Sequence, residues 1–131
     1  MNEKKLKHLE FIQGVINRFG NNSFLIKGWC ITIVAALSAL SSGTKDQYIL
    51  IAYFPVLIFW LLDSYYLWQE RLFRELYDEV RIIDESQIDF SMTFSNHAMK
   101  KHKYIDLVFS KTIIPFYSVL VVTVIILMFI I

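Results

Sequence analysis

The sequence contains the stretch TIIPFYSVLVVTVIILMFII, residues 112–131, in which twenty consecutive residues carry no charge. A helix of about 20 residues spans the roughly 30 Å hydrocarbon layer of a bilayer. Backbone groups in lipid must form their hydrogen bonds within the protein, so such a run is expected to be helical. This stretch therefore predicts a membrane-spanning helix, which we extend to residues 105–131.

Two further stretches, residues 24–43 and 48–68, have the same character. Each carries a single charged residue, Lys27 in the first and Asp63 in the second. The chain of 131 residues is 56% hydrophobic and 16% aromatic, which is more apolar than ordinary soluble domains. We therefore predict an all-α membrane protein with three transmembrane helices and a small helical cytoplasmic region.

The basic residues predict the orientation of these spans. Of the 13 Lys and Arg residues, only Lys45 lies in the short loop 44–47 between the first two spans. The positive-inside rule places the other twelve in the cytoplasm, with the amino terminus, and the carboxyl terminus in the periplasm of a bacterial inner membrane. A polar stretch precedes the first span, so we expect no cleavable signal peptide.

Residues 1–23 predict an amphipathic cytoplasmic helix, because four apolar residues recur at helical spacing. They are Leu9, Ile12, Ile16 and Phe19. The sequence GNNS at residues 20–23 predicts a turn, with Ser23 as the N-cap of the first span. We expect this helix to pack on the cytoplasmic region or on lipid headgroups; the alternative is a ligand-binding or pore-lid element.

The cytoplasmic helix and arm are assigned to residues 69–104. Residues 69–84 contain neither Gly nor Pro, so the second span is expected to continue as a helix beyond the membrane, with Pro55 kinking the span. An apolar stripe on this helix requires a partner, either residues 5–19 or a second copy. The stripe consists of Leu72, Leu76, Val80 and Ile83.

Residues 88–94 alternate apolar and polar side chains, which predicts a short extended segment.

The first span contains small residues four positions apart, which let helix backbones approach closely. Two interpretations are compatible: tight packing between helices or subunits, or a pore-lining face in which small and hydroxyl-bearing residues leave room for water and ions. The candidate pore or packing residues are Thr32, Ala35, Ala36, Ser38, Ala39, Ser42 and Gly43.

Lys27 and Asp63 both fall at the cytoplasmic ends of their spans. Charges at such a depth are costly unless they are paired or hydrated. We expect an ion pair between them at the mouth of the protein; the alternative is a ring of Asp63 carboxylates that favours cations.

Two groups of lysines lie on the predicted cytoplasmic side. They either anchor the protein to anionic headgroups or bind an anionic ligand, because a phosphate-rich partner requires several Lys or Arg on one surface. The candidate ligand-binding residues are Lys4, Lys5, Lys7, Lys100, Lys101 and Lys103.

Nothing in the sequence predicts an enzyme. The histidines His8, His97 and His102 lack metal-ligand spacing, and no glycine-rich phosphate loop or nucleophile with a base partner is present. We therefore expect no metal and no cofactor. The single cysteine, Cys30, is expected to be an apolar packing residue.

Two blocks resemble a family of short prokaryotic membrane proteins: NSFLIKGW at residues 22–29 and WLLDSYYLWQERLFRELYDEVR at residues 60–81. The family is similar to the membrane effectors of anti-phage defence cassettes, in particular the effector of the Hailong system. The resemblance implies an oligomeric ion channel for abortive infection. A cytoplasmic anionic ligand, a DNA oligomer made by a partner nucleotidyltransferase, would hold that channel closed.

Three helices cannot enclose an aqueous path, so a channel would require a homo-oligomer, most simply a tetramer or a ring of similar size. The alternative function is a membrane anchor or adaptor without a pore.

Overall fold

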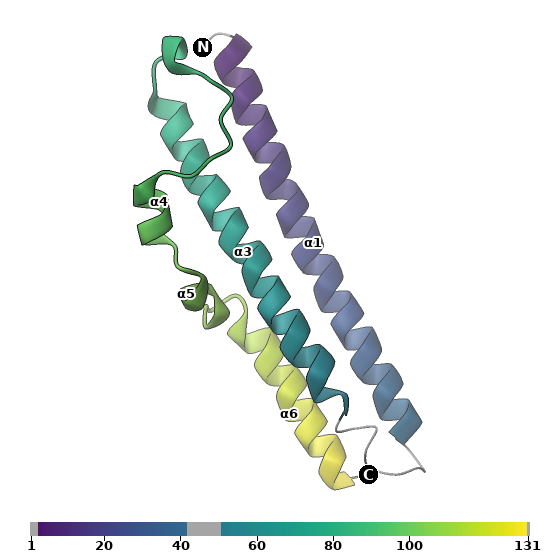
Figure 1. Ribbon diagram of the computed structural model, residues 1–131. Coiled ribbons are helices and arrows are strands. Elements are labelled where there is room, and N and C mark those ends of the chain that lie inside the picture. The colour runs from purple at the N-terminus through teal and green to yellow at the C-terminus, as the bar shows by residue number, and fades with distance from the viewer. Residues whose placement is uncertain (1–2, 42–50, 131) are drawn as a thin grey trace.

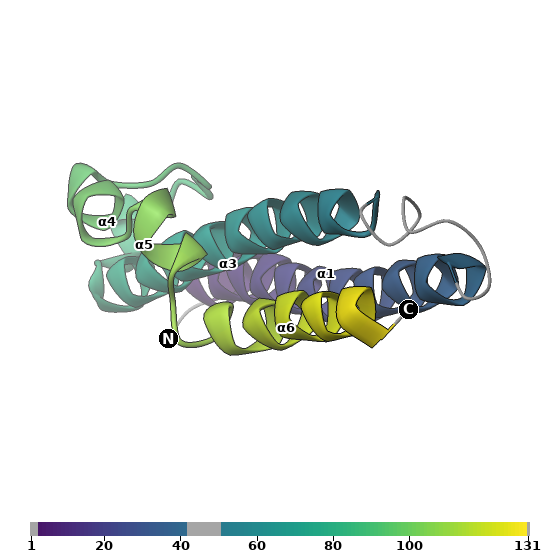
Figure 2. The same cartoon turned by 90° about the horizontal axis from the view of Figure 1, so that it is seen from below.

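The structure is a computed structural model that describes residues 3–41 and 51–130, and this part of the chain is helical without strands. Two long antiparallel helices run side by side: α1, Glu3–Ser41, and α3, Tyr53–Ile82. A third, α6, Ile114–Ile130, lies along the half of the pair that contains the start of α3 (Figures 1 and 2). The prediction of an all-α fold is confirmed.

Helix α1 runs without interruption through residues 20–23, so the predicted turn there is wrong. Ser23 does not cap a helix; its hydroxyl donates a hydrogen bond to Asp63 of α3. Gly20 in the interior of a helix costs roughly 1 kcal/mol relative to alanine. Contacts with α3 on both sides of this position, at Phe19 and at Ser23, offset that cost.

Helix α3 continues from the second apolar stretch into the charged stretch, as predicted, and ends at Ile82. Pro55 is the third residue of α3, and in the first turn a missing N–H leaves no helical hydrogen bond unmade. The helical backbone of the predicted span is instead interrupted by a turn at Ala52, between Ile51 and the start of α3, so the break precedes Pro55 and α3 begins at Tyr53.

Two apolar clusters hold the helices together. In the charged half of the molecule, Leu9, Ile12 and Ile16 of α1 pack against Leu76 and Val80 of α3. The stripe on α3 thus finds its partner within the same chain. In the other half, a second cluster joins α1, α3 and α6. Its buried members include Cys30, Val34, Val56, Leu67, Ile113, Tyr117 and Val124.

The segment between α3 and α6 folds back along α3. It contains the 3-10 turn η1, Glu85–Gln87, and the short helices α4, Asn96–Lys101, and α5, Tyr104–Val108. Residues 88–95 form no strand, and the predicted extended segment is interrupted at Phe90, whose φ of 56° is left-handed. Ile88, Met92 and Phe94 pack on the cluster around Ile12, which makes this segment an irregular arm.

Helix α6 begins at Ile114, later than the predicted start of the third span at residue 105. The backbone turns at Ser110, whose carbonyl oxygen accepts from the N–H of Ile114 at 2.9 Å and whose hydroxyl accepts from Ile113 at 3.3 Å. Pro115 follows as the second residue of α6, a position where its fixed φ is favourable. Residues 105–113 are therefore α5 and a turn.

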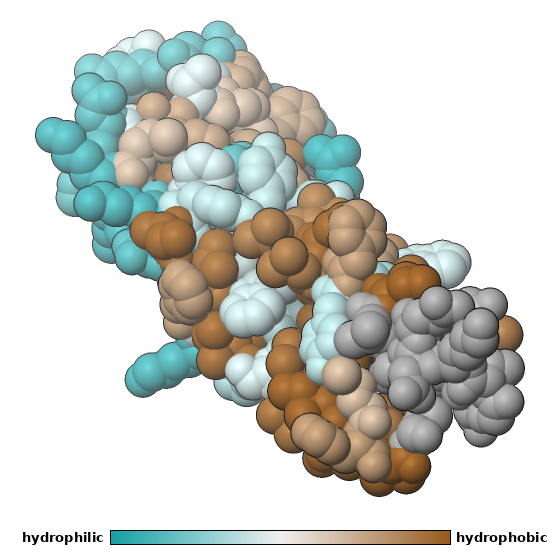
Figure 3. Space-filling view, turned by 60° about the horizontal axis from the view of Figure 1, so that its bottom comes forward, coloured by the Kyte–Doolittle hydropathy of each residue, from teal (hydrophilic) through white to brown (hydrophobic). Residues whose placement is uncertain are grey.

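By length and composition, one helix in the described residues is long and apolar enough to cross a membrane, and it is α1. The apolar helix α6 has 17 described residues. Figure 3 shows that hydrophilic residues gather over one end of the molecule and hydrophobic residues over the other half. At 1.5 Å per residue, the 39 residues of α1 extend about 60 Å, so α1 is about twice as long as a bilayer's hydrocarbon layer is thick.

Candidate functional site: a buried charge cluster that joins three helices

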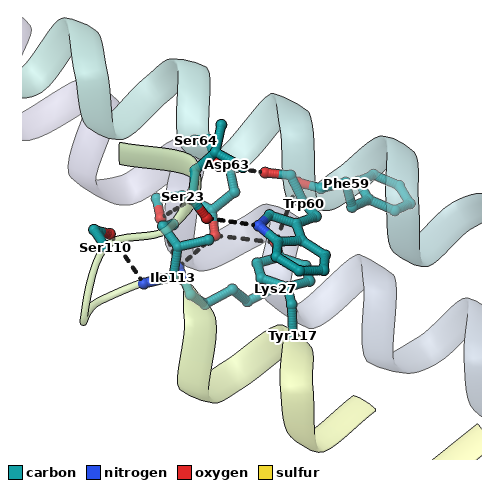
Figure 4. Close-up of polar contacts among 10 residues, drawn as sticks. Ser23, Lys27, Phe59, Trp60, Asp63, Ser64, Ser110, Ile113 and Tyr117 are labelled. Atoms are coloured by element: carbon teal, nitrogen blue, oxygen red, sulfur yellow. Dashed lines mark hydrogen bonds and ion pairs between the residues drawn. The ribbon is translucent and has the colours of Figure 1, made fainter. Parts of the chain in front are cut away.

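Asp63 is the centre of a polar cluster inside the apolar half of the molecule, and its side chain is fully buried. Its Oδ2 atom receives the Lys27 ammonium at 2.5 Å. Its Oδ1 atom accepts a hydrogen bond from the Ser23 hydroxyl, and the Tyr117 hydroxyl lies 3.0 Å from Oδ2 (Figure 4). The ion pair that the sequence led us to expect is therefore present, within a larger cluster.

Each helix contributes to this cluster for a local reason. Ser23 and Lys27 are four residues apart and so share one face of α1, where the ammonium also donates to the Ser23 hydroxyl at 2.8 Å. Tyr117 lies in the first turn of α6, and its hydroxyl also approaches the carbonyl oxygen of Phe59 at 3.2 Å. Because the start of α6 is set by the turn at Ser110, that turn places Tyr117 beside Asp63.

An aromatic shell surrounds the cluster. The ring of Trp60 stacks on that of Tyr117 with centroids 5.9 Å apart, and its indole N–H donates to the carbonyl oxygen of Val108 at 2.9 Å. The Lys27 ammonium lies 5.7 Å from the centroid of the Phe116 ring. A dry, low-dielectric surrounding strengthens the ion pair, and it also raises the cost of losing either partner.

The cluster can hold α1, α3 and α6 in one arrangement. Removing one member of a buried pair leaves an uncompensated charge, which typically costs about 3–5 kcal/mol. The Asp63 carboxylate faces Lys27 inside a single chain and has no exposed surface. This geometry favours the ion pair over an Asp63 ring that lines a mouth.

The small residues of α1 lie on the outside of the chain. Helix α1 packs inward through Ile26, Cys30 and Val34, which are buried, whereas Thr32 and Ala36 are exposed. The two rows are offset by two residues, or about 200° around the helix, and so face nearly opposite directions. Gly28, Ala35 and Ala39 are exposed and Ser38 is half-buried, while Ser42 and Gly43 lie outside the described residues.

The six candidate lysines do not form one surface within the chain. Lys5 donates to the carbonyl oxygen of Ile83 at 2.9 Å, and Lys7 lies 3.5 Å from Glu10. Lys101 belongs to α4, which lies on the other side of α3 from α1 (Figures 1 and 2). Lys4, Lys100 and Lys103 have exposed side chains. A single ligand that contacts both groups would therefore need more than one chain.

Glu75 on α3 fixes the second lysine group in place. Its carboxylate lies 3.4 Å from Lys101 and 3.3 Å from the His102 ring, and His97 lies 3.8 Å away. Burial by itself raises the pKa of Glu75, but the hydrogen bonds and charges of His102 and Lys101 outweigh it and lower that pKa. Sequence reasoning missed this cluster because its members are more than 20 residues apart in the chain.

No protein-family model, no curated protein sequence and no solved structure matches this chain. Among the described residues, no group of three or more His, Cys, Asp or Glu side chains is arranged to hold a metal ion.

Proposed function

We propose that this chain is a three-span inner-membrane protein whose copies assemble into a ligand-gated ion channel, which acts as a membrane effector of anti-phage defence. The observation that carries the proposal is the outward-facing row of small residues on α1, in the apolar half of the molecule. The resemblance of residues 22–29 and 60–81 to membrane effectors supports the defence role.

Three spans are supported by the apolar exterior of α3 and α6. In the first half of α3, large side chains such as Phe54 and Leu57 are more than half exposed, and in α6 so are Val119 and Phe129. An exposed apolar surface of this extent is stabilised by lipid or by another protein. The described Lys and Arg residues lie in the charged half or at its boundary, which fits a cytoplasmic location under the positive-inside rule.

Assembly through α1 is supported by the position of its small residues. In lipid there is little hydrophobic gain from packing two helices, so close contact depends on small side chains that let the backbones approach. Gly28 and Ala36 are exposed, and a Cβ added at Gly28 would meet no atom within 4 Å among the described residues. A second copy of α1 is a partner of the right shape, and a ring of such contacts would surround a path for ions.

Gating follows from the continuity of the long helices. Both α1 and α3 run from the charged half into the apolar half, and the Asp63 cluster ties them to α6 near the boundary. A ligand that binds the cytoplasmic half of one state more tightly shifts the population toward that state. We propose that the ligand is a polyanion, a DNA oligomer from a partner nucleotidyltransferase, and that it favours the closed state.

Conduction is tested with purified protein in liposomes that hold a potassium gradient, with a potential-sensitive dye as the readout. Wild type should dissipate the potential. Ala36→Leu, which enlarges the small face, should reduce the flux strongly, whereas Val119→Leu, which enlarges an exposed side chain on α6, should not. A wild type that assembles but passes no ions would favour the anchor or adaptor function instead.

Ligand binding is tested with short single-stranded DNA across a salt series. If lysines neutralise phosphates, the logarithm of affinity should fall with the logarithm of salt by roughly 0.7 per phosphate contact. Replacing Lys100, Lys101 and Lys103 together by glutamine should weaken binding and make cells sick through an open channel. Absence of binding at low salt, with normal growth of the triple variant, would favour headgroup anchoring.

A further inference from the structure

A small cavity of about 220 Å³ lies between the amino-terminal part of α1, the end of α3 and the arm. Its polar lining comes from His8, Glu79, Gln87, Asp89 and Ser91. A water molecule occupies about 30 Å³ of liquid volume, so the cavity has room for a group of several heavy atoms. This cavity is far along α1 from the Asp63 cluster, and Lys5 of the first lysine group lies at its edge.

His8 supplies an unused hydrogen-bond acceptor. Its side chain is 1% exposed, and its Nε2 atom lies 2.9 Å from the carbonyl oxygen of Ser91. Because a carbonyl oxygen only accepts, Nε2 must carry the proton, which makes Nδ1 an acceptor in the neutral ring. Nδ1 is buried and has no hydrogen-bond partner among the described residues. A buried acceptor left without a donor typically costs about 1–3 kcal/mol.

Two carboxylates also line the cavity, and each is only partly used. One oxygen of Glu79 accepts from the Ser95 hydroxyl at 2.6 Å, and one oxygen of Asp89 accepts from the N–H of Ser91 at 3.0 Å. A carboxylate can accept several hydrogen bonds, so both retain capacity. Lys5 lies beside the cavity, where its ammonium donates to Ile83, so two negative charges stand against one positive charge.

We propose that this cavity binds an organic cation rich in N–H groups, an alkylguanidinium or alkylammonium. The Nδ1 atom of His8 accepts one N–H, and the carboxylates of Glu79 and Asp89 accept others and balance the charge. A guanidinium suits the site best because its donors form a rigid planar fork. The cation is either a free small molecule or the side chain of a protein.

The test is calorimetric titration of the full chain in nanodiscs with two probes, agmatine for the free cation and N-acetylarginine amide for a protein side chain. Butylurea, which has a similar shape without the charge, is the control ligand. We expect saturable binding of at least one cationic probe and none of butylurea. Tighter binding of agmatine would identify a free cation as the source, and tighter binding of the amide a protein side chain.

Three variants locate the binding. Asp89→Asn and Glu79→Gln keep acceptors for Ser91 and Ser95 but lose the charge. His8→Gln keeps an N–H for Ser91 but replaces the ring acceptor Nδ1 by an amide oxygen at a different position. Each should weaken binding at least about tenfold, whereas Glu10→Gln, which neutralises an exposed carboxylate elsewhere on α1, should not. If His8→Gln does not fold, Asp89→Asn decides, since Asp89 is exposed.

Three results would overturn the proposal: no saturable binding of either cation, equal binding of butylurea, or unchanged binding by the Asp89 and Glu79 variants. The outcome is independent of ion conduction, because the titration measures the binding of an organic cation and no ion flux.

Discussion

Asp63 shows how one charged residue in an apolar stretch can organise its surroundings. Its carboxylate accepts from Ser23 and Lys27 of α1, and the Tyr117 hydroxyl of α6 lies beside it. The pairing of Lys27 with Asp63 was predictable, since both charges fall at the same end of their spans. The roles of Ser23 and Tyr117 were not, because they depend on the unbroken course of α1 and on where α6 begins.

A double-mutant cycle tests the pair. Lys27→Met should lower the free energy of unfolding in detergent by about 3–5 kcal/mol, because it leaves the fully buried Asp63 carboxylate unpaired. Asp63→Asn should cost less, because the Lys27 side chain is 22% exposed and can be hydrated. The double variant should lose less than the sum of the two single losses. The pair Lys7–Glu10, 3.5 Å apart on α1 with both side chains exposed, is the control, and its cycle should give at most about 1 kcal/mol. Additive effects of Lys27 and Asp63 would show that they act separately.

Glu75 gives a pH-dependent contribution to stability. Since His102 and Lys101 lower the pKa of Glu75 in the folded protein, the stabilisation is present above the ordinary glutamate pKa and is lost as pH falls through the lowered folded value. The free energy of unfolding should therefore decrease between about pH 6 and about pH 3. Glu75→Gln should decrease less over the same range. Identical pH profiles would contradict the contribution of Glu75.

At the scale of the helices, the periodicity of apolar residues predicted which helix faces are buried, but it did not predict every helix boundary. The apolar stripes of α1 and α3 pack where the sequence predicted, whereas the arm is not continuously extended, because the backbone of Phe90 is left-handed. The turn at residues 20–23 was wrong because tertiary contacts on both sides outweigh the local preference of Gly and Asn for a turn. The start of α6 was also misplaced, since hydropathy does not register the hydrogen bonds of Ser110.

A reporter that works only outside the cytoplasm tests the order of the spans. Fused after Ile131 or inserted at Gly43 it should be active, and inserted at Gln87 it should be inactive, because the positive-inside rule predicts that Gln87 lies in the cytoplasm with twelve of the thirteen Lys and Arg residues. A reporter that works only in the cytoplasm should give the reverse pattern. Cytoplasmic activity at the Ile131 fusion would contradict three spans.

At the scale of the whole molecule, composition and periodicity predicted an all-helical chain with one charged and one apolar half. They also placed both lysine groups on one side, but they did not reveal that α3 separates these groups or that Glu10 and Glu75 lie beside them. Such facts follow from the packing of helices distant in sequence. One ligand could contact both lysine groups only if the two groups came from different chains of an assembly.

The central claim is that the protein functions as an assembly built on the small face of α1. Native mass spectrometry of the protein in nanodiscs measures the subunit number directly. We predict a defined oligomer of wild type, on the order of four subunits, which Ala36→Leu or Ala39→Leu disrupts and Val119→Leu preserves. A wild type that stays monomeric at membrane-like concentration would contradict both the oligomer and the pore.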